Sequence, residues 1–531
     1  MGNDPERSEP AEPVIGFWNV ARLDADATAI VAIDDDANPI AQITRGELAE
    51  RSNRLVHALR AKGLTTGSVV ATVMRNEIEF FSVLLAGLQA GWYVVPINYH
   101  FAPREVAYIL DDAEVSAVFC SAATAELARE AIAATETVDP AMCFASAEGY
   151  GLTTIAELAA SGSPEPPAER TTGWFMTYTS GTTGRPKGIK RPLSGADPDQ
   201  VGFAWRLQVQ MFHIDERVPH VHLVQSPCYH TAVLGFANSA VQYGHQVILM
   251  DRWSPETTLR AIDRYKVTTT HMVPTQFHRL LRADPEVRAS ADVSSLRNVA
   301  HGAAPCPPEV KRAMIDWWGP VILEYYGASE GGGTVATSED WLNHPGTVGR
   351  PWPGAEVRIL DDAGNQLPPG ETGTVWLKAG ALDFEYHKRP EQTSESKRDG
   401  FFTVGDLGHV DEEGFLYLHG RSSEVIISGG VNVHPSEIEY VLLAHPDVAD
   451  VGVIGVPDQE WGERIVAVVQ PESGADRDTL IERLTAHARS QLAGFKVPRQ
   501  FHLADGLPRD PNGKLYRRRL LDEYKPETAG A

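Results

Sequence analysis

The 531-residue sequence is poor in cysteine, and none of its four cysteines forms a CxxC pair. Their wide spacing excludes a dense disulfide framework and gives no ligand pattern for zinc. We therefore expect free, buried thiols at Cys120, Cys143, Cys228 and Cys306.

Positive charge and long apolar runs are also scarce. The chain has 47 Lys and Arg residues against 71 Asp and Glu, which gives a net charge of −24. Because affinity for nucleic acid or an anionic membrane comes mainly from Lys and Arg, we expect neither as a partner. No run approaches the length of apolar sequence that crosses a bilayer, so no membrane span is predicted.

The N-terminal stretch MGNDPERSEPAEP is acidic and rich in proline. It lacks the basic and apolar regions of a signal peptide, so we predict a cytoplasmic protein whose residues 1–15 form a disordered tail. The sequence leaves the oligomeric state open, with a homodimer as one option.

Strand-like and helix-like segments alternate in the N-terminal half. The run 69–74 is short and apolar, 78–91 has helical periodicity, and 93–98 is strand-like again. The same rhythm recurs between residues 246 and 273. Such alternation is typical of α/β layers built around a largely parallel sheet.

The pattern changes near residue 345, where short β-like runs are separated by Gly and Pro. Beyond residue 449, two strand-like runs and an amphipathic helix at 478–492 indicate a smaller α+β unit. A chain of this length predicts two to four structural units. We expect an α/β fold with a large N-terminal domain at 16–422, made of layered α/β subdomains and a β-rich subdomain, and a small α+β C-terminal domain at 423–531.

The segment TYTSGTTGRPKG at 177–188 combines Gly, Thr and Ser with one lysine, Lys187. Glycine lets successive N–H groups point toward one centre, and such a nest with hydroxyls and a cation binds phosphate. The Walker A spacing does not fit, because Gly188 follows Lys187. Alone, the segment predicts either another kind of phosphate loop or a flexible surface loop.

Four further segments follow in a fixed order: EYYGASEGGG at 324–333, TVGDLGHVDEEGFLYLHGR at 403–421, IISGGVNVHPSEIE at 426–439 and LPRDPNGKLYRRRL at 507–520. With the Gly/Thr segment, they resemble the adenylate-forming enzyme superfamily. This superfamily includes acyl-CoA synthetases, firefly-type luciferases and peptide-synthetase adenylation domains. The resemblance covers roughly residues 16–522, and the AMP-forming acyl-CoA synthetase branch fits best.

The resemblance implies a ligase reaction in two steps. A carboxylate attacks the α-phosphorus of MgATP and gives an acyl-adenylate and pyrophosphate. The thiol of CoA then takes the acyl group, and AMP leaves. The C-terminal domain is expected to be mobile and to rotate between the steps. The expected cofactors are ATP, Mg²⁺ and CoA, and the expected partner is a small carboxylic acid.

The resemblance also assigns residues to the nucleotide. The Gly/Thr loop is expected to hold the β- and γ-phosphates, Tyr326 to stack on adenine, and Asp406 to accept hydrogen bonds from the ribose. The full ATP- and AMP-binding set is Thr179, Ser180, Gly181, Thr182, Thr183, Gly184, Lys187, Gly302, Ala303, Ala304, Tyr325, Tyr326, Gly327, Ala328, Ser329, Asp406 and Arg421.

Three residues are assigned to catalysis. Lys514 is expected to stabilise charge on the α-phosphate and the carboxylate. Glu330 is expected to hold Mg²⁺, a hard cation that prefers oxygen ligands. His230 is placed beside the acyl carboxylate, where it would gate the thiol tunnel.

The CoA-binding set implied by the resemblance is Ser428, Gly429 and Gly430, since a residue without Cβ lets pantetheine pass close to the backbone. One position departs from the family pattern. The hinge residue is usually Asp or Lys, and here it is Ser423. A short neutral side chain lacks the salt-bridge options of either. The substitution is either harmless or shifts the balance between the two orientations, with adenylation as the weaker half-reaction.

The acyl pocket is expected to be lined mainly by small residues, namely Thr231, Ala232, Gly235, Phe236, Gly331 and Gly332. The pocket has no Arg or Lys for a second carboxylate and no Asp for an α-amino group. We therefore expect a hydrophobic monocarboxylic acid of medium or long chain, or an aryl or polycyclic one. Two alternatives remain: an adenylation enzyme that loads a separate carrier protein, and a binding or regulatory relative without catalysis. Retention of Lys187, Glu330, Asp406 and Lys514 argues against the second.

Overall fold

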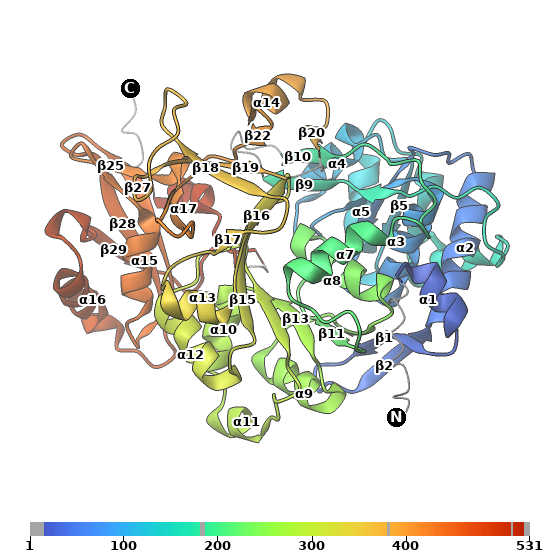
Figure 1. Cartoon of the computed structure of the whole chain (residues 1–531), viewed down its shortest axis with the longest axis horizontal. Helices are drawn as coiled ribbons and strands as arrows, with labels where there is room; N and C mark the ends of the chain where they lie inside the picture. The colour runs from blue at the N-terminus through green and yellow to red at the C-terminus, as the bar shows by residue number, and fades with distance from the viewer. Residues whose placement is uncertain (1–14, 181–185, 380–382, 511–512, 525–531) are drawn as a thin grey trace, which may run out of the picture. The chain divides into compact units, whose positions relative to one another are not determined.

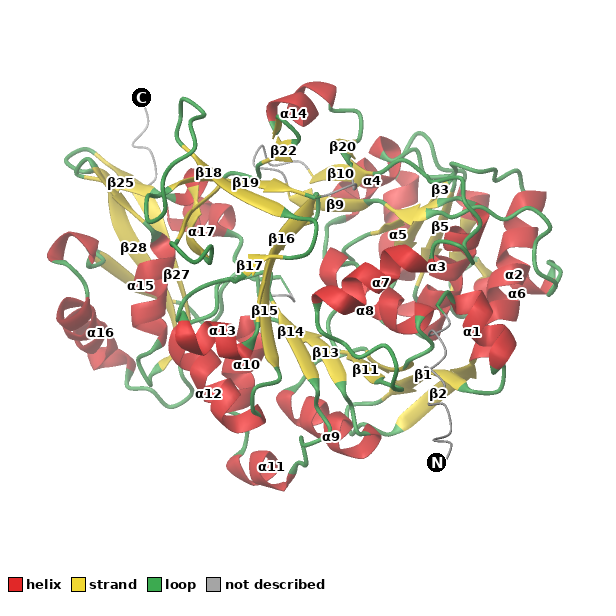
Figure 2. Ribbon diagram, viewed as in Figure 1, coloured by secondary structure: helices red, strands yellow, loops and turns green. Residues whose placement is uncertain are grey.

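The computed structural model describes residues 15–180, 186–379, 383–510 and 513–524. The chain divides into two compact units. The first comprises residues 1–178, 190–270 and 291–298, and the second comprises 179–189, 271–290 and 299–531. The predicted domain boundary at 422/423 stays a prediction. Figure 1 follows the chain through both units, and Figure 2 shows its helices and strands.

A parallel six-stranded sheet forms one layer of the first unit, with the strand order β7-β6-β5-β3-β4-β8. Its strands are β3 (Val69–Val73), β4 (Tyr93–Pro96), β5 (Ala117–Cys120), β6 (Cys143–Ala145), β7 (Thr153–Thr154) and β8 (Trp174–Phe175). All five residues of β3 are buried, as expected for a parallel strand covered on both faces. Helix α3 (Ile78–Ala90) is buried at every residue except Glu79 and ends at Gly91, whose φ is 73°. The predicted βαβ unit is therefore present.

The first unit also contains strands of a second sheet in the order β13-β11-β12-β1-β2. These are β1 (Thr28–Ile33), β2 (Pro39–Thr44), β11 (Val221–Val224), β12 (Gln246–Met250) and β13 (Thr269–Met272), of which the last two residues fall in the second unit. Strand β11 runs parallel to both β12 and β13. Helices α7 (Gly202–Met211) and α8 (Thr231–Gln242) contact one another, and α8 contacts β11 and β12.

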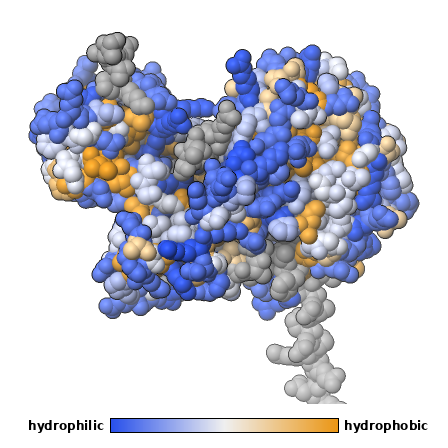
Figure 3. All heavy atoms as spheres, turned by 90° about the horizontal axis from the view of Figure 1, so that it is seen from above, coloured by the Kyte–Doolittle hydropathy of each residue, from blue (hydrophilic) through white to orange (hydrophobic). Residues whose placement is uncertain are grey.

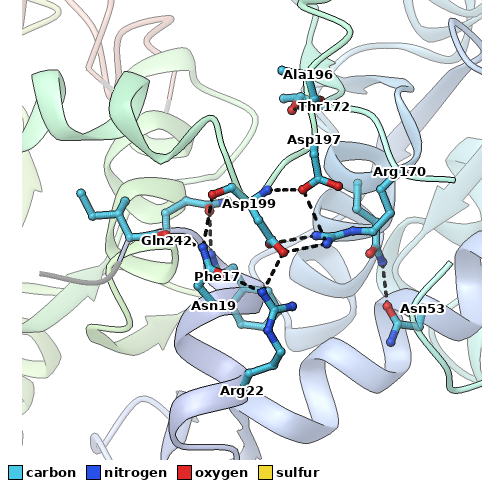
Figure 4. A network of polar contacts seen from close by, with 12 residues as sticks. Phe17, Asn19, Arg22, Asn53, Arg170, Thr172, Ala196, Asp197, Asp199 and Gln242 are labelled. Carbon is cyan, nitrogen blue, oxygen red and sulfur yellow. Dashed lines mark hydrogen bonds and ion pairs between the residues drawn. The ribbon is translucent and has the colours of Figure 1, made fainter. Parts of the chain in front are cut away.

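A polar network ties the N-terminal helix α1 (Phe17–Leu23) into the first unit (Figure 4). Asp199 accepts hydrogen bonds from Arg170 at 2.8 and 3.0 Å and from Arg22 at 2.7 Å. Burial opposes ionisation, but the two arginines hold the pKa of Asp199 below its usual value. The backbone N–H of Phe17 donates to the side chain of Gln242, the last residue of α8, at 2.9 Å.

The second unit contains β14 (Asn298–His301), whose first residue falls in the first unit, together with β15 (Ile322–Ala328), β16 (Gly331–Ala336) and β17 (Arg350–Pro351). Strands β14 and β15 are parallel, and β15 to β17 are antiparallel. A β-rich sheet follows in the order β21-β22-β19-β23-β24, with β18 paired to β19. Its strands are β18 (Glu356–Leu360), β19 (Gly373–Lys378), β21 (Lys397–Arg398), β22 (Phe401–Phe402), β23 (Asp406–Val410) and β24 (Leu416–Arg421). This sheet accounts for the change of sequence pattern near residue 345.

The C-terminal part of the second unit is a small α+β layer. Its strands are β25 (Ile426–Ser428), β26 (Val431–Val433), β27 (Val448–Asp458), β28 (Gly462–Pro471) and β29 (Gln500–Leu503). Its helices are α15 (Pro435–Leu443), α16 (Arg477–Gln491) and α17 (Arg517–Tyr524). Strands β27 and β28 form a long antiparallel hairpin, and Leu480, Leu484 and Ala488 of α16 are buried as the amphipathic pattern predicts. The expected α/β fold, with a large N-terminal and a small C-terminal domain, is confirmed.

The cysteines and the surface agree with the composition. All four thiols are free; Cys120, Cys143 and Cys228 are buried, and Cys306 is only half-buried. Figure 3 shows a face on which hydrophilic residues predominate and apolar residues gather in scattered patches. Among the residues that the structure describes, no helix is long and apolar enough to cross a membrane.

Candidate active site

Lys187, Glu330 and Tyr386 form one cluster in the second unit. Lys187 lies on β10 (Pro186–Lys190), and its ammonium group is 3.5 Å from the centroid of the Tyr386 ring. The Tyr386 hydroxyl donates to Oε1 of the buried Glu330 at 2.7 Å. Burial lowers the pKa of Lys187, the charge of Glu330 opposes this, and Arg421 adds to the lowering. Tyr386 was missed by the sequence analysis, because the surrounding FEYHK carries no motif or periodic signal.

A second cluster joins Tyr326, Asp406 and Arg421. The Tyr326 hydroxyl donates to Oδ2 of Asp406 at 2.6 Å, and Nε of Arg421 donates to Oδ1 at 3.1 Å. Asp406 and Arg421 are direct partners in the antiparallel pairing of β23 and β24. Strand pairing thus brings together a carboxylate and a cation that are 15 residues apart.

Lys514 lies within electrostatic range of this second cluster. Burial comes first in lowering its pKa and the charge of Arg421 adds to the effect, whereas Asp510, Glu424 and Asp406 oppose it. The Lys514 backbone N–H donates to Asp510 at 2.9 Å. Three cations, Lys187, Arg421 and Lys514, therefore converge in a protein with a net charge of −24. Cations that disfavour one another's charge are a feature of sites built to receive an anion.

The loop at 301–304 packs against β15. A Cβ added at Gly302 would lie 2.7 Å from the ring of Tyr325, and Ala303 adopts a positive φ of 67°. Tyr325 in turn has its hydroxyl 2.9 Å from Nε2 of His271. Ala304 lies in the same loop. Close packing against Tyr325 accounts for the small residue at position 302. The contact of this loop with adenine stays a prediction.

The glycines around residue 330 also have a packing role. A Cβ at Gly333 would lie 2.5 Å from the Trp352 ring, and one at Gly327 would lie 3.3 Å from it. Gly331 and Gly332, which begin β16, adopt φ values of 117° and 67°. Ala328 ends β15, and Ser329 follows it in the turn between the two strands. The sequence indicated open volume at Gly331 and Gly332. The structure adds that their positive φ values favour glycine at both positions, and their place in an acyl pocket stays a prediction.

The predicted CoA-binding residues form the turn of the β25–β26 hairpin, which Ser428 begins. Gly429 and Gly430 have φ values of 59° and 78°, the left-handed pair that a tight hairpin turn requires. The Gly429 N–H donates to the carbonyl of Trp461 at 2.8 Å. A Cβ at Gly430 would meet no described atom within 4 Å.

The predicted hinge residue Ser423 is exposed in the short helix η3 (Ser422–Glu424). The adjacent Glu424 accepts a hydrogen bond from Arg517 at 3.1 Å. Part of the predicted phosphate loop, namely Gly181, Thr182, Thr183 and Gly184, lies outside the described residues. Thr179 and the backbone of Ser180 belong to β9 (Thr177–Ser180), which pairs with β10.

The predicted acyl-binding residues of the first unit lie at the start of α8. His230 precedes the helix, Thr231 and Ala232 begin it, and Gly235 faces Gln208 of α7, since an added Cβ would lie 3.3 Å from Nε2. Tyr229 lies next to His230, with ring centroids 4.3 Å apart.

A small cavity extends from Phe236 in the first unit. It is lined by Gln208, Val209, Ile214, His222, Phe236, Ser239, Ala240, His245 and Thr269. His222 stacks on Phe236 at 6.4 Å, and its Nδ1 lies 2.9 Å from the Thr269 hydroxyl. Burial lowers the pKa of both His222 and His245 to about 3. Both rings are therefore neutral near pH 7, and the cavity wall is polar without being charged.

The layered α/β fold thus carries cations next to Tyr326, Asp406 and Glu330. The AMP-binding enzyme family matches residues 17–382, and the AMP-binding enzyme C-terminal domain matches residues 437–514. The chain belongs to the AMP-binding enzyme family, and it is an AMP-forming acid ligase.

The relatives are acid ligases of different substrates. The chain is 31% identical over 500 residues to a fatty acid–[acyl-carrier-protein] ligase of Streptomyces coeruleorubidus, and the match covers 92% of each of the two chains. It is 32% identical over 506 residues to a feruloyl-CoA synthase of Amycolatopsis sp, covering 94% of this chain and 97% of the relative. The solved structure of o-succinylbenzoate CoA synthetase from Bacillus subtilis with its acyl-adenylate intermediate matches with a TM-score of 0.80 at 26% identity, covering 97% of this chain and 99% of that one.

Proposed function

We propose that this chain is an acyl-CoA ligase that activates a hydrophobic monocarboxylic acid as its acyl-adenylate and transfers the acyl group to CoA. The observation that carries the proposal is the convergence of Lys187, Arg421 and Lys514 around Asp406 and Glu330. A triphosphate has the charge to satisfy three cations, and the carboxylate of Asp406 has the lone pairs to accept ribose hydroxyls.

Each side chain then has a distinct role. Lys187 is proposed to hold the departing pyrophosphate, and Lys514 to stabilise the charge that develops between carboxylate and α-phosphate. Tyr326 offers a ring face for adenine, because its hydroxyl is fixed on Asp406. These groups bind and orient the two reactants. Such positioning can supply a large part of the rate enhancement.

Glu330 fits the magnesium role. It is a buried carboxylate, 5% exposed, and the hydroxyl of Tyr386 orients one of its oxygens. Mg²⁺ is commonly held by one or two carboxylates together with substrate phosphates, so a single glutamate is a sufficient protein ligand. When bound, Mg²⁺ would neutralise phosphate charge.

The substrate class is inferred from the cavity at Phe236. Its histidines are neutral, and none of the described side chains that line it is charged, so a second carboxylate or an ammonium group would be buried there without a charged partner among them. A hydrophobic acid with at most a neutral hydrogen-bonding group is favoured. The activities named for the two relatives, on a fatty acid and on ferulate, are compatible with that class.

The acceptor is proposed to be CoA, since Gly430 presents open space at the hairpin turn. The alternative is a carrier protein, which the name of the Streptomyces relative favours. Ser423 motivates a further proposal that adenylation is the weaker half-reaction, because the exposed hinge has no charge of its own.

One experiment tests these proposals together. A panel of fatty, aryl and polycyclic acids is incubated with MgATP, first without a thiol, then with CoA, and then with a holo-carrier protein. Pyrophosphate release and thioester formation are measured separately. We expect an acid-dependent release of pyrophosphate and a CoA thioester with the same acid. A carrier-protein thioester without a CoA thioester would favour the alternative, and no release with any acid would contradict the proposal.

A further inference from the structure

Helix α10 (Pro274–Leu281) and the residue after it contact the C-terminal layer of the second unit. Thr275, His278 and Arg282, the residue that ends the helix, are spaced i, i+3 and i+7 and therefore share one face. Arg282 contacts the start of β27 and Glu472, His278 lies against Arg282, and Thr275 contacts Gly513. We call these three residues the α10 seat.

Arg282 makes the charged contact of the seat. Its Nη1 donates to the carbonyl oxygen of Val448 at 2.8 Å and forms an ion pair with Glu472. Val448 starts β27 and is paired with Pro471 at the end of β28, so both contacts fall at one end of the hairpin. The side chains of Arg282 and Glu472 are each 33% exposed.

His278 adds a contact at the same place. Its Nε2 lies 2.6 Å from Nη1 of Arg282, and the backbone of Ala449, next to Val448, acts to raise the pKa of the ring. Burial first, and the charge of Arg282 next, lower the pKa of His278 to about 4. The ring is therefore neutral near pH 7, and Nε2 can accept a hydrogen bond from the guanidinium.

Thr275 contacts the segment that bears Lys514. A Cβ added at Gly513 would lie 2.3 Å from the Thr275 hydroxyl, so the Gly513 backbone packs directly on this side chain. Arg509 donates to the Gly513 carbonyl at 2.7 Å and pairs with Asp450 on β27 at 2.6 and 2.7 Å. Gly513, the residue before Lys514, is thus held between Thr275 of the α10 seat and Arg509, which pairs with β27.

We propose that the α10 seat holds the C-terminal layer in the orientation that brings Lys514 to the nucleotide, with Arg282 and Glu472 as positioning residues for adenylation. This inference rests on the proposed function and its two half-reactions. A partly exposed ion pair contributes little stability. It can still shift an equilibrium between two orientations, because a tenfold change in the ratio of their populations needs only a small difference in free energy.

Charge reversal tests the ion pair. Arg282→Glu should lower the rate of acid-dependent pyrophosphate release about three- to tenfold, consistent with a partly exposed pair. Transfer to CoA from a supplied acyl-adenylate should stay within about twofold of the wild type. The double variant Arg282→Glu, Glu472→Arg should restore most of the lost adenylation. Arg489→Glu, an equal charge change at an exposed position of α16, is the matched control.

An equal loss of both half-reactions in Arg282→Glu, or no recovery in the double variant, would overturn the proposal. A second measurement does not depend on catalysis. Arg282→Cys, Glu472→Cys treated with a short bis-maleimide should give a linked peptide pair by mass spectrometry, and each single-cysteine variant should not. Absence of the link would also reject the seat. A link in a protein that activates no acid would instead reject the proposed function and retain the seat.

Discussion

The ammonium group of Lys187 lies 3.5 Å from the centre of the Tyr386 ring, and the hydroxyl of the same ring donates to Glu330 at 2.7 Å. One tyrosine therefore holds both the cation proposed for pyrophosphate and the carboxylate proposed for Mg²⁺. The cation–π contact and the hydrogen bond use different parts of the side chain, and they can be removed separately.

Tyr386→Phe should keep the ring under Lys187 and remove the hydrogen bond to Glu330. Hydrogen bonds to charged groups contribute about 1.5–3 kcal/mol, so we expect adenylation to fall about tenfold or more. The Mg²⁺ concentration at half-maximal rate should rise, because Glu330 loses its orienting donor. Pyrophosphate release over a magnesium titration measures both effects.

Tyr417→Phe is the matched control, because it removes a hydroxyl that donates to another carboxylate, Asp411, at 3.2 Å. It should leave the magnesium dependence unchanged. A Tyr386→Phe enzyme with reduced rate but an unaltered magnesium requirement would show that the hydroxyl does not act by orienting a magnesium ligand.

Lys514→Ala should cripple adenylation and largely spare acyl transfer from a supplied adenylate. Removing one group that stabilises developing charge typically costs about 10²–10³-fold. Burial and Arg421 lower the pKa of Lys514, so wild-type adenylation should lose activity on the alkaline side at a lower pH than an ordinary lysine would dictate.

The control for Lys514 is Lys496→Ala, which removes an ammonium group from the same layer, where it pairs with Glu437 at 2.7 Å. It should leave the ratio of the two half-reactions intact. Similar losses in both half-reactions of Lys514→Ala would count against its assignment to adenylation.

The sequence was most informative where local patterns determine structure. The apolar run at 69–73 became a fully buried parallel strand, and the spacing of Leu480 and Leu484 became the buried face of α16. The contacts of Tyr386 and Arg282 could not be predicted, because they join residues 56 and 190 positions apart with no shared motif. The same limit applies to Gly333, whose small size reflects packing on Trp352.

The pH dependence of stability should report on Glu77, which precedes α3. Burial raises the pKa of Glu77 to about 7, although the Ser121 hydroxyl donates to it at 2.6 Å. A native pKa above the unfolded value means that the native state binds more protons between these two values. The free energy of unfolding contributed by this group is therefore fully present below about pH 4.5 and is lost as pH rises through about 7.

The side chain introduced by Glu77→Gln cannot ionise. The variant should therefore not lose this contribution to the free energy of unfolding as pH rises. We subtract the free energy of unfolding of wild type from that of the variant. This difference should be about 1–3 kcal/mol larger at pH 8 than at pH 5. Urea unfolding at the two pH values measures this. Glu130→Gln, at an exposed position of α5 (Ala125–Ala133), changes the charge equally and leaves the hydrogen bond between Ser121 and Glu77 in place. A pH-independent difference between Glu77→Gln and wild type would refute the assignment.

Two substitutions of Gly430 distinguish the effect of a changed hairpin turn from that of a blocked passage for pantetheine. Its φ of 78° disfavours any residue with a Cβ, so alanine and leucine carry the same backbone cost. A Cβ at this position would meet no described atom within 4 Å, so the longer Leu side chain would extend into the space beside the turn.

Gly430→Leu should spare pyrophosphate release and reduce CoA thioester formation well below the level of Gly430→Ala. The two variants should match in adenylation, measured with one acid and saturating ATP. Equal thioester formation by alanine and leucine would mean that the acceptor thiol does not pass Gly430, and the passage would then have to be sought elsewhere.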